Sequence, residues 1–417
     1  MKRFIFILPI IISIQGYPQQ ITLNDCLISA TDNHVLNNEA KNNESIHNLN
    51  KKNLNSKWLP ELNIQAQASY QDPVMNLSLP VGNIEINQPN DQYKTWLDIK
   101  QNIYDGGIIQ KSKKIEIQTE KIDQVNTEIK IYDIKKTVTD LYFNVLILQT
   151  QKKQMQLLKQ ELDERLNNIN SLIKAGAALK SNADALIAEH LKLSQQIIEI
   201  NMNISSLKQV LSIYTGINMN DSCLLIIPVL IYNSDTTNNR LEYNLFSTQL
   251  EQFTLYKSLQ QSALYPKIYG FAQIGYGKPG LNMLSDEFDN YYIIGAGLSW
   301  TIFDWNQTRH NKQITELQKS NVQVAKDNFD KNLSAATEQA KTKIFLQKQL
   351  LESDNEIIDA YSQIASTARS QFDNGTINSV DLITELNKER TAIINNEIHK
   401  IKYAQAIAEY YILTGNL

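Results

Sequence analysis

The chain repeats its own landmarks at long range, and this repetition limits its possible folds more than any other feature. Three pairs of landmarks are each separated by 199 residues. They are Tyr104-Asp105 with Phe303-Asp304, Gly176 with Gly375, and Tyr214-Thr215-Gly216 with Leu413-Thr414-Gly415. A repeat of this length is not a solenoid unit. The sequence therefore predicts a duplicated half, with repeat 1 over residues 19–220, a connecting segment over 221–237 and repeat 2 over 238–417.

Each repeat contains two stretches in which apolar and polar residues alternate. Leu62 to Gln71 alternates without a fault, which is typical of a strand with one apolar and one polar face. Strands are predicted at about 61–72, 93–104, 266–277 and 291–303. Each has about ten residues, the length of a tilted strand that crosses a bilayer. The polar segments that link the strands of each pair are expected to be exposed loops.

Aromatic residues favour a membrane sheet over the alternative of a soluble sandwich. The four tryptophans are Trp58, Trp96, Trp300 and Trp305. All of them lie in or beside the predicted strands, and tyrosines cluster there as well. Aromatic side chains at strand ends form the girdles that mark the two membrane interfaces.

The remainder of each repeat has a helical pattern. Glycine (14) and proline (9) are scarce, which is typical of long uninterrupted elements. Apolar residues spaced by three, four or seven predict coiled-coil seams in helical hairpins over 108–216 and 306–413. One seam is predicted along Leu350, Ile357, Tyr361, Ile364 and Ala368. Each hairpin turns at a glycine, as in a left-handed helix cap, and its long arm would measure on the order of 100 Å.

The first residues have the pattern of a secretory leader. Lys2 and Arg3 precede an apolar stretch from Phe4 to Ile14, and polar residues follow. This order of charged, apolar and polar segments predicts a signal peptide over residues 1–18 and therefore an exported protein. No later stretch reaches the length of a membrane-spanning helix.

Four amphipathic strands cannot close a barrel in lipid, because an open sheet edge leaves backbone groups without hydrogen-bond partners. A chain with this pattern is expected to complete its barrel with further copies. Three copies would supply twelve strands, a number within the range of outer-membrane barrels. The helical hairpins would then form a second tube on the periplasmic side, and a hollow object of this kind is a duct.

Other classes of function find little support. A net charge of −4 gives no electrostatic basis for binding nucleic acid. The five histidines are scattered, and Cys26 and Cys223 form no zinc or disulfide pattern, so no metal is expected. Gly275 to Gly280 matches a dinucleotide fingerprint but runs into a proline-containing loop instead of a helix. The chain is therefore expected to be no enzyme and to hold no cofactor.

The chain carries an ordered set of motifs: Leu23-Asn24-Asp25-Cys26-Leu27, Leu59-Pro60, Tyr104-Asp105-Gly106-Gly107, Leu298 to Asp304, Phe372 to Thr376 and Tyr410 to Gly415. With this set, nearly the whole chain resembles the TolC-like outer-membrane efflux proteins. The resemblance implies an α+β membrane protein with two structural repeats and four transmembrane strands per chain. A homotrimer would form a 12-stranded barrel in the outer membrane and a periplasmic barrel of coiled-coil helices.

The resemblance also implies a periplasmic gate at the helix tips. Asp381, six residues after the glycine of the second turn, matches the first aspartate of the family's constriction, and Asn182 and Asp184 lie near the same place in repeat 1. The family's second aspartate is Thr384 here, and its usual arginine is Ile377. Asp381 is expected to join a ring of three carboxylates that favours cations, or to stabilise the start of its helix.

The partners implied by the resemblance are a periplasmic adaptor and, through it, an inner-membrane pump. The turn residues Gly176, Ala177, Gly375 and Thr376 would dock the adaptor. The chain would then act as a passive export duct. The alternative is a structural or adhesive coiled-coil protein of the envelope, but the short loops between the predicted strands favour the duct.

Overall fold

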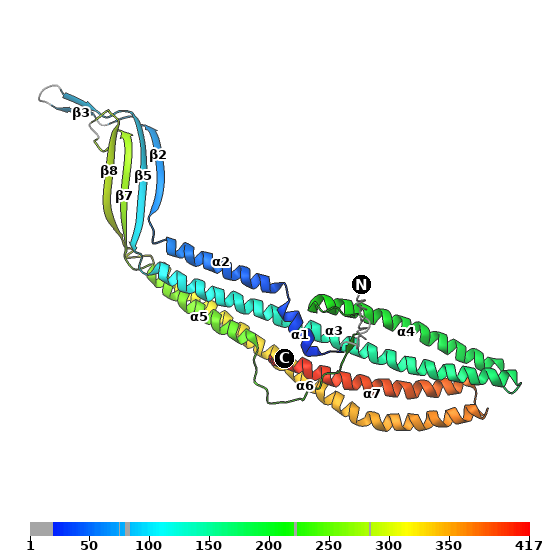
Figure 1. The fold of residues 1–417 in the computed structure, drawn as a ribbon. Coiled ribbons are helices and arrows are strands. Elements are labelled where there is room, and N and C mark those ends of the chain that lie inside the picture. The colour runs from blue at the N-terminus through cyan, green and yellow to red at the C-terminus, as the bar shows by residue number, and fades with distance from the viewer. Residues whose placement is uncertain (1–19, 75, 80–83, 221–222, 283–284) are drawn as a thin grey trace, which may run out of the picture. The chain divides into compact units, whose positions relative to one another are not determined.

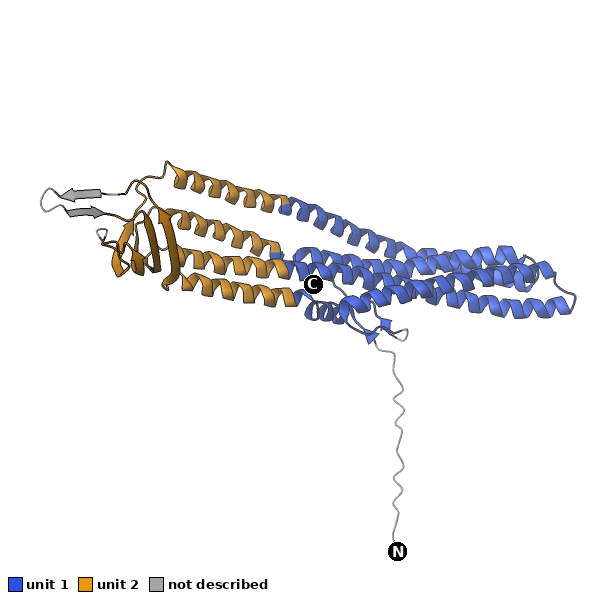
Figure 2. Cartoon of the chain, turned by 90° about the horizontal axis from the view of Figure 1, so that it is seen from above, with its two compact units in different colours: residues 1–37, 128–241, 329–417 blue, residues 38–127, 242–328 orange. Residues whose placement is uncertain are grey.

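The structure is a computed structural model that describes residues 20–74, 76–79, 84–220, 223–282 and 285–417. The predicted signal peptide over 1–18 lies outside these residues. The chain divides into two compact units, which Figure 2 shows in separate colours. Unit 1 takes in the chain up to Asn37, residues 128–241 and residues 329–417, and unit 2 comprises residues 38–127 and 242–328. The two repeats therefore both contribute to both units.

Unit 2 contains a four-stranded sheet. Its strands are β2 (Glu61–Tyr70), β5 (Asp91–Tyr104), β7 (Lys267–Lys278) and β8 (Asp289–Ser299). They hydrogen-bond in the order β2-β5-β7-β8, and every neighbouring pair is antiparallel (Figure 1). Repeat 1 supplies the first two strands and repeat 2 the last two. The α+β fold predicted from the alternating pattern is confirmed.

The two faces of this sheet differ in polarity. One row of register neighbours consists of Leu62, Ile99, Ala272 and Ile294. The next row consists of Asn63, Asp98, Gln273 and Ile293. Because successive residues of a strand point to opposite faces, the first row belongs to an apolar face and the second to a mainly polar one. The apolar face is open in the single chain, where Ile64 is 83% exposed and Ile294 is 76% exposed.

A small hairpin occupies the segment between β2 and β5 that was expected to be a loop. Its strands, β3 (Asn76–Leu79) and β4 (Ile84–Asn87), pair antiparallel. The prediction of a plain loop was wrong here, because four residues are too few for an alternating pattern to stand out among polar neighbours.

Seven helices account for most of the described chain. They are α1 (Leu23–Asp32), α2 (Leu36–Ser56), α3 (Ile108–Lys174), α4 (Lys180–Thr215), α5 (Leu241–Ser262), α6 (Gln307–Asp373) and α7 (Ser379–Thr414). The duplication extends to their lengths, since α3 and α6 both have 67 residues and α4 and α7 both have 36. Within the described residues, none of these helices is sufficiently long and apolar to cross a membrane.

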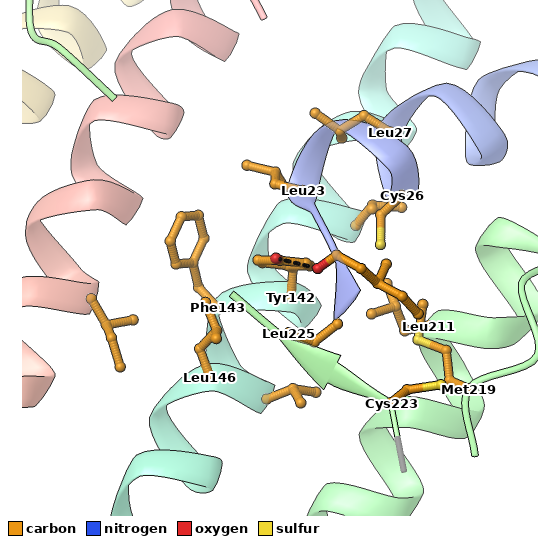
Figure 3. Close-up of a cluster of buried hydrophobic side chains, with 14 of the residues drawn as sticks. Leu23, Cys26, Leu27, Tyr142, Phe143, Leu146, Leu211, Met219, Cys223 and Leu225 are labelled. Atoms are coloured by element: carbon orange, nitrogen blue, oxygen red, sulfur yellow. Dashed lines mark hydrogen bonds between the residues drawn. The ribbon is translucent and has the colours of Figure 1, made fainter. Parts of the chain in front are cut away.

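A buried cluster holds unit 1 together where α1, α3 and α4 meet two short strands (Figure 3). The strands β1 (Gln20–Ile21) and β6 (Leu224–Leu225) pair in parallel. Tyr142 of α3 is fully buried among them, and its hydroxyl lies 2.9 Å from the Ile21 carbonyl oxygen and 2.7 Å from that of Ile226. The tyrosine thereby joins both strands to the helices. Its burial raises the pKa of the phenol.

One predicted coiled-coil seam is confirmed only in part. On α6, Ile357 and Ile364 were expected to be buried but are 44% and 47% exposed. Ala368, the last residue of the predicted seam, is buried as expected, and Ala365 and Phe372 are buried beside it. Alanine gives a weak hydrophobic signal, yet its small side chain lets neighbouring helices approach closely. The larger isoleucines therefore drew the prediction to the wrong stripe of the helix.

The strand-to-helix junctions of the two repeats share one construction. At the start of α3, the Asp105 carboxylate accepts hydrogen bonds from the amides of Gly107 (2.8 Å) and Ile109 (2.6 Å). At the start of α6, the Asp304 carboxylate accepts one from the amide of Thr308 (2.8 Å). Each aspartate satisfies amides at the start of its helix that have no partner within the helix.

The residues that follow these two aspartates differ. Repeat 1 has Gly106 and Gly107, with φ of 70° and 84°, whereas repeat 2 has Trp305 and Asn306, with φ of 51° and 62°. Glycine adopts this left-handed conformation freely, and asparagine tolerates it. For a bulky side chain such as that of Trp305 it costs about 1–2 kcal/mol.

Candidate functional site

The helix-tip turns of unit 1 have the same backbone geometry in both repeats. Gly176 follows α3 with φ 75°, and Gly375 follows α6 with φ 70°. The amide of Ala177 donates to a carbonyl five residues earlier (2.8 Å), and the amide of Thr376 does the same (2.9 Å). This bond defines a Schellman cap, which ends a helix sharply and satisfies its last carbonyls. All four residues are exposed. The turns that contain them, between α3 and α4 and between α6 and α7, lie at one end of unit 1 (Figures 1 and 2).

The three candidate gate residues lie just beyond these turns. Asp184 is in the second turn of α4 and Asp381 is in the first turn of α7, and both side chains are exposed. Asn182 is half-buried, and its side-chain oxygen accepts a hydrogen bond from the amide of Ser379 at 3.4 Å. Asn182 thereby links the start of α4 to the start of α7. Asn182 therefore makes a contact between the two repeats, while the side chains of the two aspartates are exposed to solvent.

The start of α7 is capped by a neighbour of Asp381. The side-chain oxygen of Asn378 accepts hydrogen bonds from the amides of Val380 (2.9 Å) and Asp381 (3.0 Å). Asp381 is thus not needed as the capping residue, although its negative charge still interacts favourably with the helix dipole at this end. This arrangement leaves its carboxylate available for another role.

The two positions that depart from the family pattern have structural partners of their own. The hydroxyl of Thr384 donates to the Val380 carbonyl of the same helix at 2.8 Å. Ile377 is half-buried against a hydrophobic cluster that includes Leu186 of α4 and Leu382 of α7. The substitutions therefore replace two charged tip residues with groups that are satisfied within one chain.

Beneath the tips, a cluster of charges joins three helices. The Arg369 guanidinium of α6 pairs with Glu161 of α3 and with Glu389 of α7, the latter at 2.6 Å. Arg390 of α7 donates to the Gln154 side chain at 2.7 Å. The hydrogen bonds that Arg369 donates to these carboxylates, Glu161 first, raise the pKa of Arg369, whereas burial lowers the pKa of Arg390.

Sequence reasoning missed this charge cluster. Arg369 and Glu161 are 208 residues apart, so no local spacing connects them. Neither belongs to the apolar residues whose spacing predicted the coiled-coil seams. Paired charges of this kind are identified from the packing of helices and not from a pattern along one helix.

The tips carry exposed negative charge and have no geometry suited to a metal site. Within the described residues, no three His, Cys, Asp or Glu side chains are arranged to hold a metal ion. An exposed carboxylate near a turn can still attract cations through its charge when copies are brought together.

Comparisons with known proteins agree with this description. Residues 248–408 match the family model described as outer membrane efflux protein. No curated protein matches the sequence. The fold, however, is similar to that of several solved outer-membrane channels.

Three of these solved structures illustrate the similarity. The CmeC outer membrane channel of Campylobacter jejuni is 15% identical, with a TM-score of 0.67 over 94% of this chain and 85% of CmeC. The outer membrane protein VceC of Vibrio cholerae is 12% identical, with a TM-score of 0.68 over 94% of this chain and 96% of VceC. The open state of the MtrE channel of Neisseria gonorrhoeae is 16% identical, with a TM-score of 0.67 over 94% of this chain and 88% of MtrE.

The family match covers most of repeat 2, and the structural similarity extends over both repeats. The sequence motifs, the order of strands and helices and these comparisons all agree. Residues 248–408 therefore match the outer membrane efflux protein family, and the fold over both repeats is similar to that of solved outer-membrane channels.

Proposed function

We propose that three copies of this chain form a passive export duct through the outer membrane. The duct would receive cargo from a periplasmic adaptor and an inner-membrane pump, and the helix tips would gate it. The observation that carries the proposal is the four-stranded sheet, which has an apolar face and two unpaired edges.

The strand directions support closure by head-to-tail assembly. Because all neighbours in the order β2-β5-β7-β8 are antiparallel, the edge strands β2 and β8 run in opposite directions. The β8 edge of one copy can therefore pair antiparallel with the β2 edge of the next. Repeating this step closes a barrel and leaves no edge open to lipid. With three copies the barrel has about twelve strands.

The faces of the sheet support the same assembly. The face that contains Ile64 and Ile294 would meet lipid, since both side chains are apolar and exposed in the single chain. The opposite face would line the lumen, where Gln273 donates to the Asp98 carboxylate at 2.9 Å. A barrel with a polar interior conducts water-soluble cargo.

Exposed apolar residues on α6 supply a second contact between copies. Leu317 and Val324, seven residues apart, are 67% and 62% exposed. Ile357 and Ile364, also seven residues apart, are open as well. Residues at this spacing form one stripe of a helix, and a stripe of large apolar side chains is suited to a neighbouring helix.

At the tips, we propose that Asp381 and Asp184 form the acidic constriction, with Asn182 positioning the two helix starts. The exposed turns at Gly176, Ala177, Gly375 and Thr376 would contact the adaptor. Their Schellman geometry supports this role, because a sharp and rigid tip presents the same surface in every copy.

The first test is single-channel recording in a planar bilayer, using protein extracted from outer membranes as a trimer. We expect long-lived, cation-selective steps that lanthanum ions block from the helical side. Asp381→Ala should raise the conductance and weaken the block by about tenfold, because three carboxylates are removed from the constriction.

The matched control is Glu352→Ala, which removes one exposed carboxylate per chain from α6 away from the tips. Its conductance and block should equal those of the wild type. An inserted trimer that stays silent both as wild type and as Asp381→Ala would contradict the duct. Unchanged block in Asp381→Ala alone would contradict the gate and leave the duct intact.

A further inference from the structure

The junction between β8 and α6 carries a tryptophan, Trp305, at a position where repeat 1 has glycine. Gly106 and Gly107 occupy the two left-handed positions in repeat 1, whereas Trp305 and Asn306 occupy them in repeat 2. Glycine at these two positions is therefore sufficient for the junction to fold. The indole of Trp305 is present in spite of its strained backbone, so a requirement other than folding has to explain it.

The indole of Trp305 is displayed to the surroundings. Trp305 is 83% exposed, and Phe303, at 64% exposed, packs edge-on against it with ring centroids 4.9 Å apart. Nearby, the indole nitrogen of Trp300 donates to the Leu264 carbonyl at 3.0 Å, and the ring is 56% exposed. Three large aromatic side chains thus stand open where the sheet ends. This is the level at which tryptophan anchors membrane proteins.

Beside these rings lies a cavity of about 820 Å³ between α5 and α6. Its lining includes the cations Lys257, Arg309 and Lys312 and the carboxylates Asp304 and Glu316. Both carboxylates already have interaction partners within the chain. Glu316 pairs with Lys257 at 2.6 Å, and Asp304 accepts from the amide of Thr308.

Arg309 and Lys312 are left without a counter-charge. Among the described residues, no carboxylate lies within ion-pairing distance of either side chain. Both also lie in the first two turns of α6, where the helix dipole disfavours positive charge. In repeat 1 the residue that corresponds to Arg309 is Gln110, so the fold does not require a cation there. An anion in the cavity would compensate both charges.

We propose that this cavity binds the phosphate group of an anionic phospholipid at the periplasmic surface of the outer membrane. Arg309 and Lys312 would hold the phosphate, and Trp305 and Phe303 would lie against the glycerol and the first acyl carbons. Guanidinium and ammonium groups bind phosphate through charge-assisted hydrogen bonds. The proposal rests on the proposed position of the sheet in the outer membrane.

Two variants test it by restoring the residue of repeat 1. Trp305→Gly removes the indole and the backbone strain together, so we expect lipid binding to weaken while the thermal midpoint stays equal or rises. Arg309→Gln removes one cation, and the dissociation constant for lipid should rise on the order of fivefold. Arg309→Lys keeps the charge and should retain most of the affinity. Lys331→Gln, which removes an exposed cation elsewhere on α6, is the control.

The measurement is native mass spectrometry of delipidated protein in detergent, titrated with phosphatidylglycerol, with phosphatidylethanolamine and with inorganic phosphate. Of the three ligands, the wild type should retain phosphatidylglycerol most strongly. The mole fraction of bound phosphatidylglycerol should fall in Trp305→Gly and Arg309→Gln only. Because lipid retention is measured in detergent, it does not depend on conduction. A silent channel that still retains lipid would contradict the duct and keep the lipid site.

Three results would overturn the lipid site. Equal retention by wild type, Trp305→Gly and Arg309→Gln would show that lipid binds elsewhere. Displacement of the lipid by millimolar inorganic phosphate would assign the cavity to a free anion. Loss of the trimer in Arg309→Gln, with lipid retention unchanged per chain, would assign the cavity to the neighbouring copy.

Discussion

At the scale of single residues, Gly375 shows how a turn can depend on its backbone alone. Its φ of 70° lies in the left-handed region, and no atom lies within 4 Å of the position that a Cβ would occupy. Gly375→Ala meets no steric obstacle, so its whole effect is conformational. We expect a loss of about 1 kcal/mol of stability, measured as a lower thermal midpoint by circular dichroism.

Gln371→Ala is the control for Gly375→Ala, because it changes an exposed residue of the preceding helical turn. It should leave the midpoint unchanged. If Gly375→Ala were as stable as the wild type, the tip would tolerate a relaxed turn in place of the Schellman cap.

The capping box that starts α1 gives a prediction about pH. The Asp25 carboxylate accepts hydrogen bonds from the Thr22 hydroxyl (2.7 Å) and amide (3.0 Å), and these bonds lower the pKa of Asp25. A folded-state pKa below the unfolded one contributes stability above the unfolded pKa, and this stability is lost as the pH falls through the folded pKa. Thr22→Ala should therefore cost about 1 kcal/mol at neutral pH and less in acid.

The measurement for Thr22→Ala is its thermal midpoint against that of the wild type, from about pH 7 to about pH 2. The gap between the two proteins should narrow toward the acid end. A gap that stays constant with pH would mean that the carboxylate of Asp25 contributes nothing beyond the hydroxyl cap.

At the scale of elements, α6 offers a test of contact between copies. Val324 is 62% exposed on a stripe of large apolar residues. Val324→Asp places a charge there, so the proposed trimer should dissociate while the helical content of each chain stays unchanged. Mass photometry measures the first effect and circular dichroism the second. Ser320→Asp, an exposed polar position on the same helix, should leave the trimer intact.

A Val324→Asp protein that remains a trimer would contradict the contribution of this stripe to the assembly. The free edges of β2 and β8 would then have to supply the contact between copies without it.

Sequence reasoning recovered the elements that depend on local patterns. The ten-residue alternation that begins at Leu62 is long enough to define β2 and its two faces. The β3–β4 hairpin escaped it, because strands of four residues carry almost no periodic signal. On α6 the buried Ala365 was also missed, since the larger Ile364 dominated the pattern, although Ala368 was predicted correctly. The size of the apolar side chains along one helix was a poor guide to which stripe of that helix packs against a neighbouring helix.

At the scale of the whole molecule, the repeat itself was readable, and the contacts between repeats were not. The 199-residue offset aligns Gly176 with Gly375, whose turns share one geometry. By contrast, the hydrogen bond from Ser379 to Asn182 and the pair of Arg369 with Glu161 join residues from different repeats. Such contacts depend on how helices pack, which no offset or spacing contains. The candidate gate residues were therefore located by motif, and the role of Asn182 between the repeats came only from the structure.

The matched helix lengths have a consequence for how proteins of this kind can change over time. The long helices have 67 residues each and the short ones 36, and together they bury one hydrophobic cluster near their tips. Deleting a heptad from α3 alone would leave the tip of α6 without its partners. The lengths of the four helices are therefore expected to change together during evolution. A chain in which one of them becomes shorter has to shorten the other three by the same amount to keep this cluster buried.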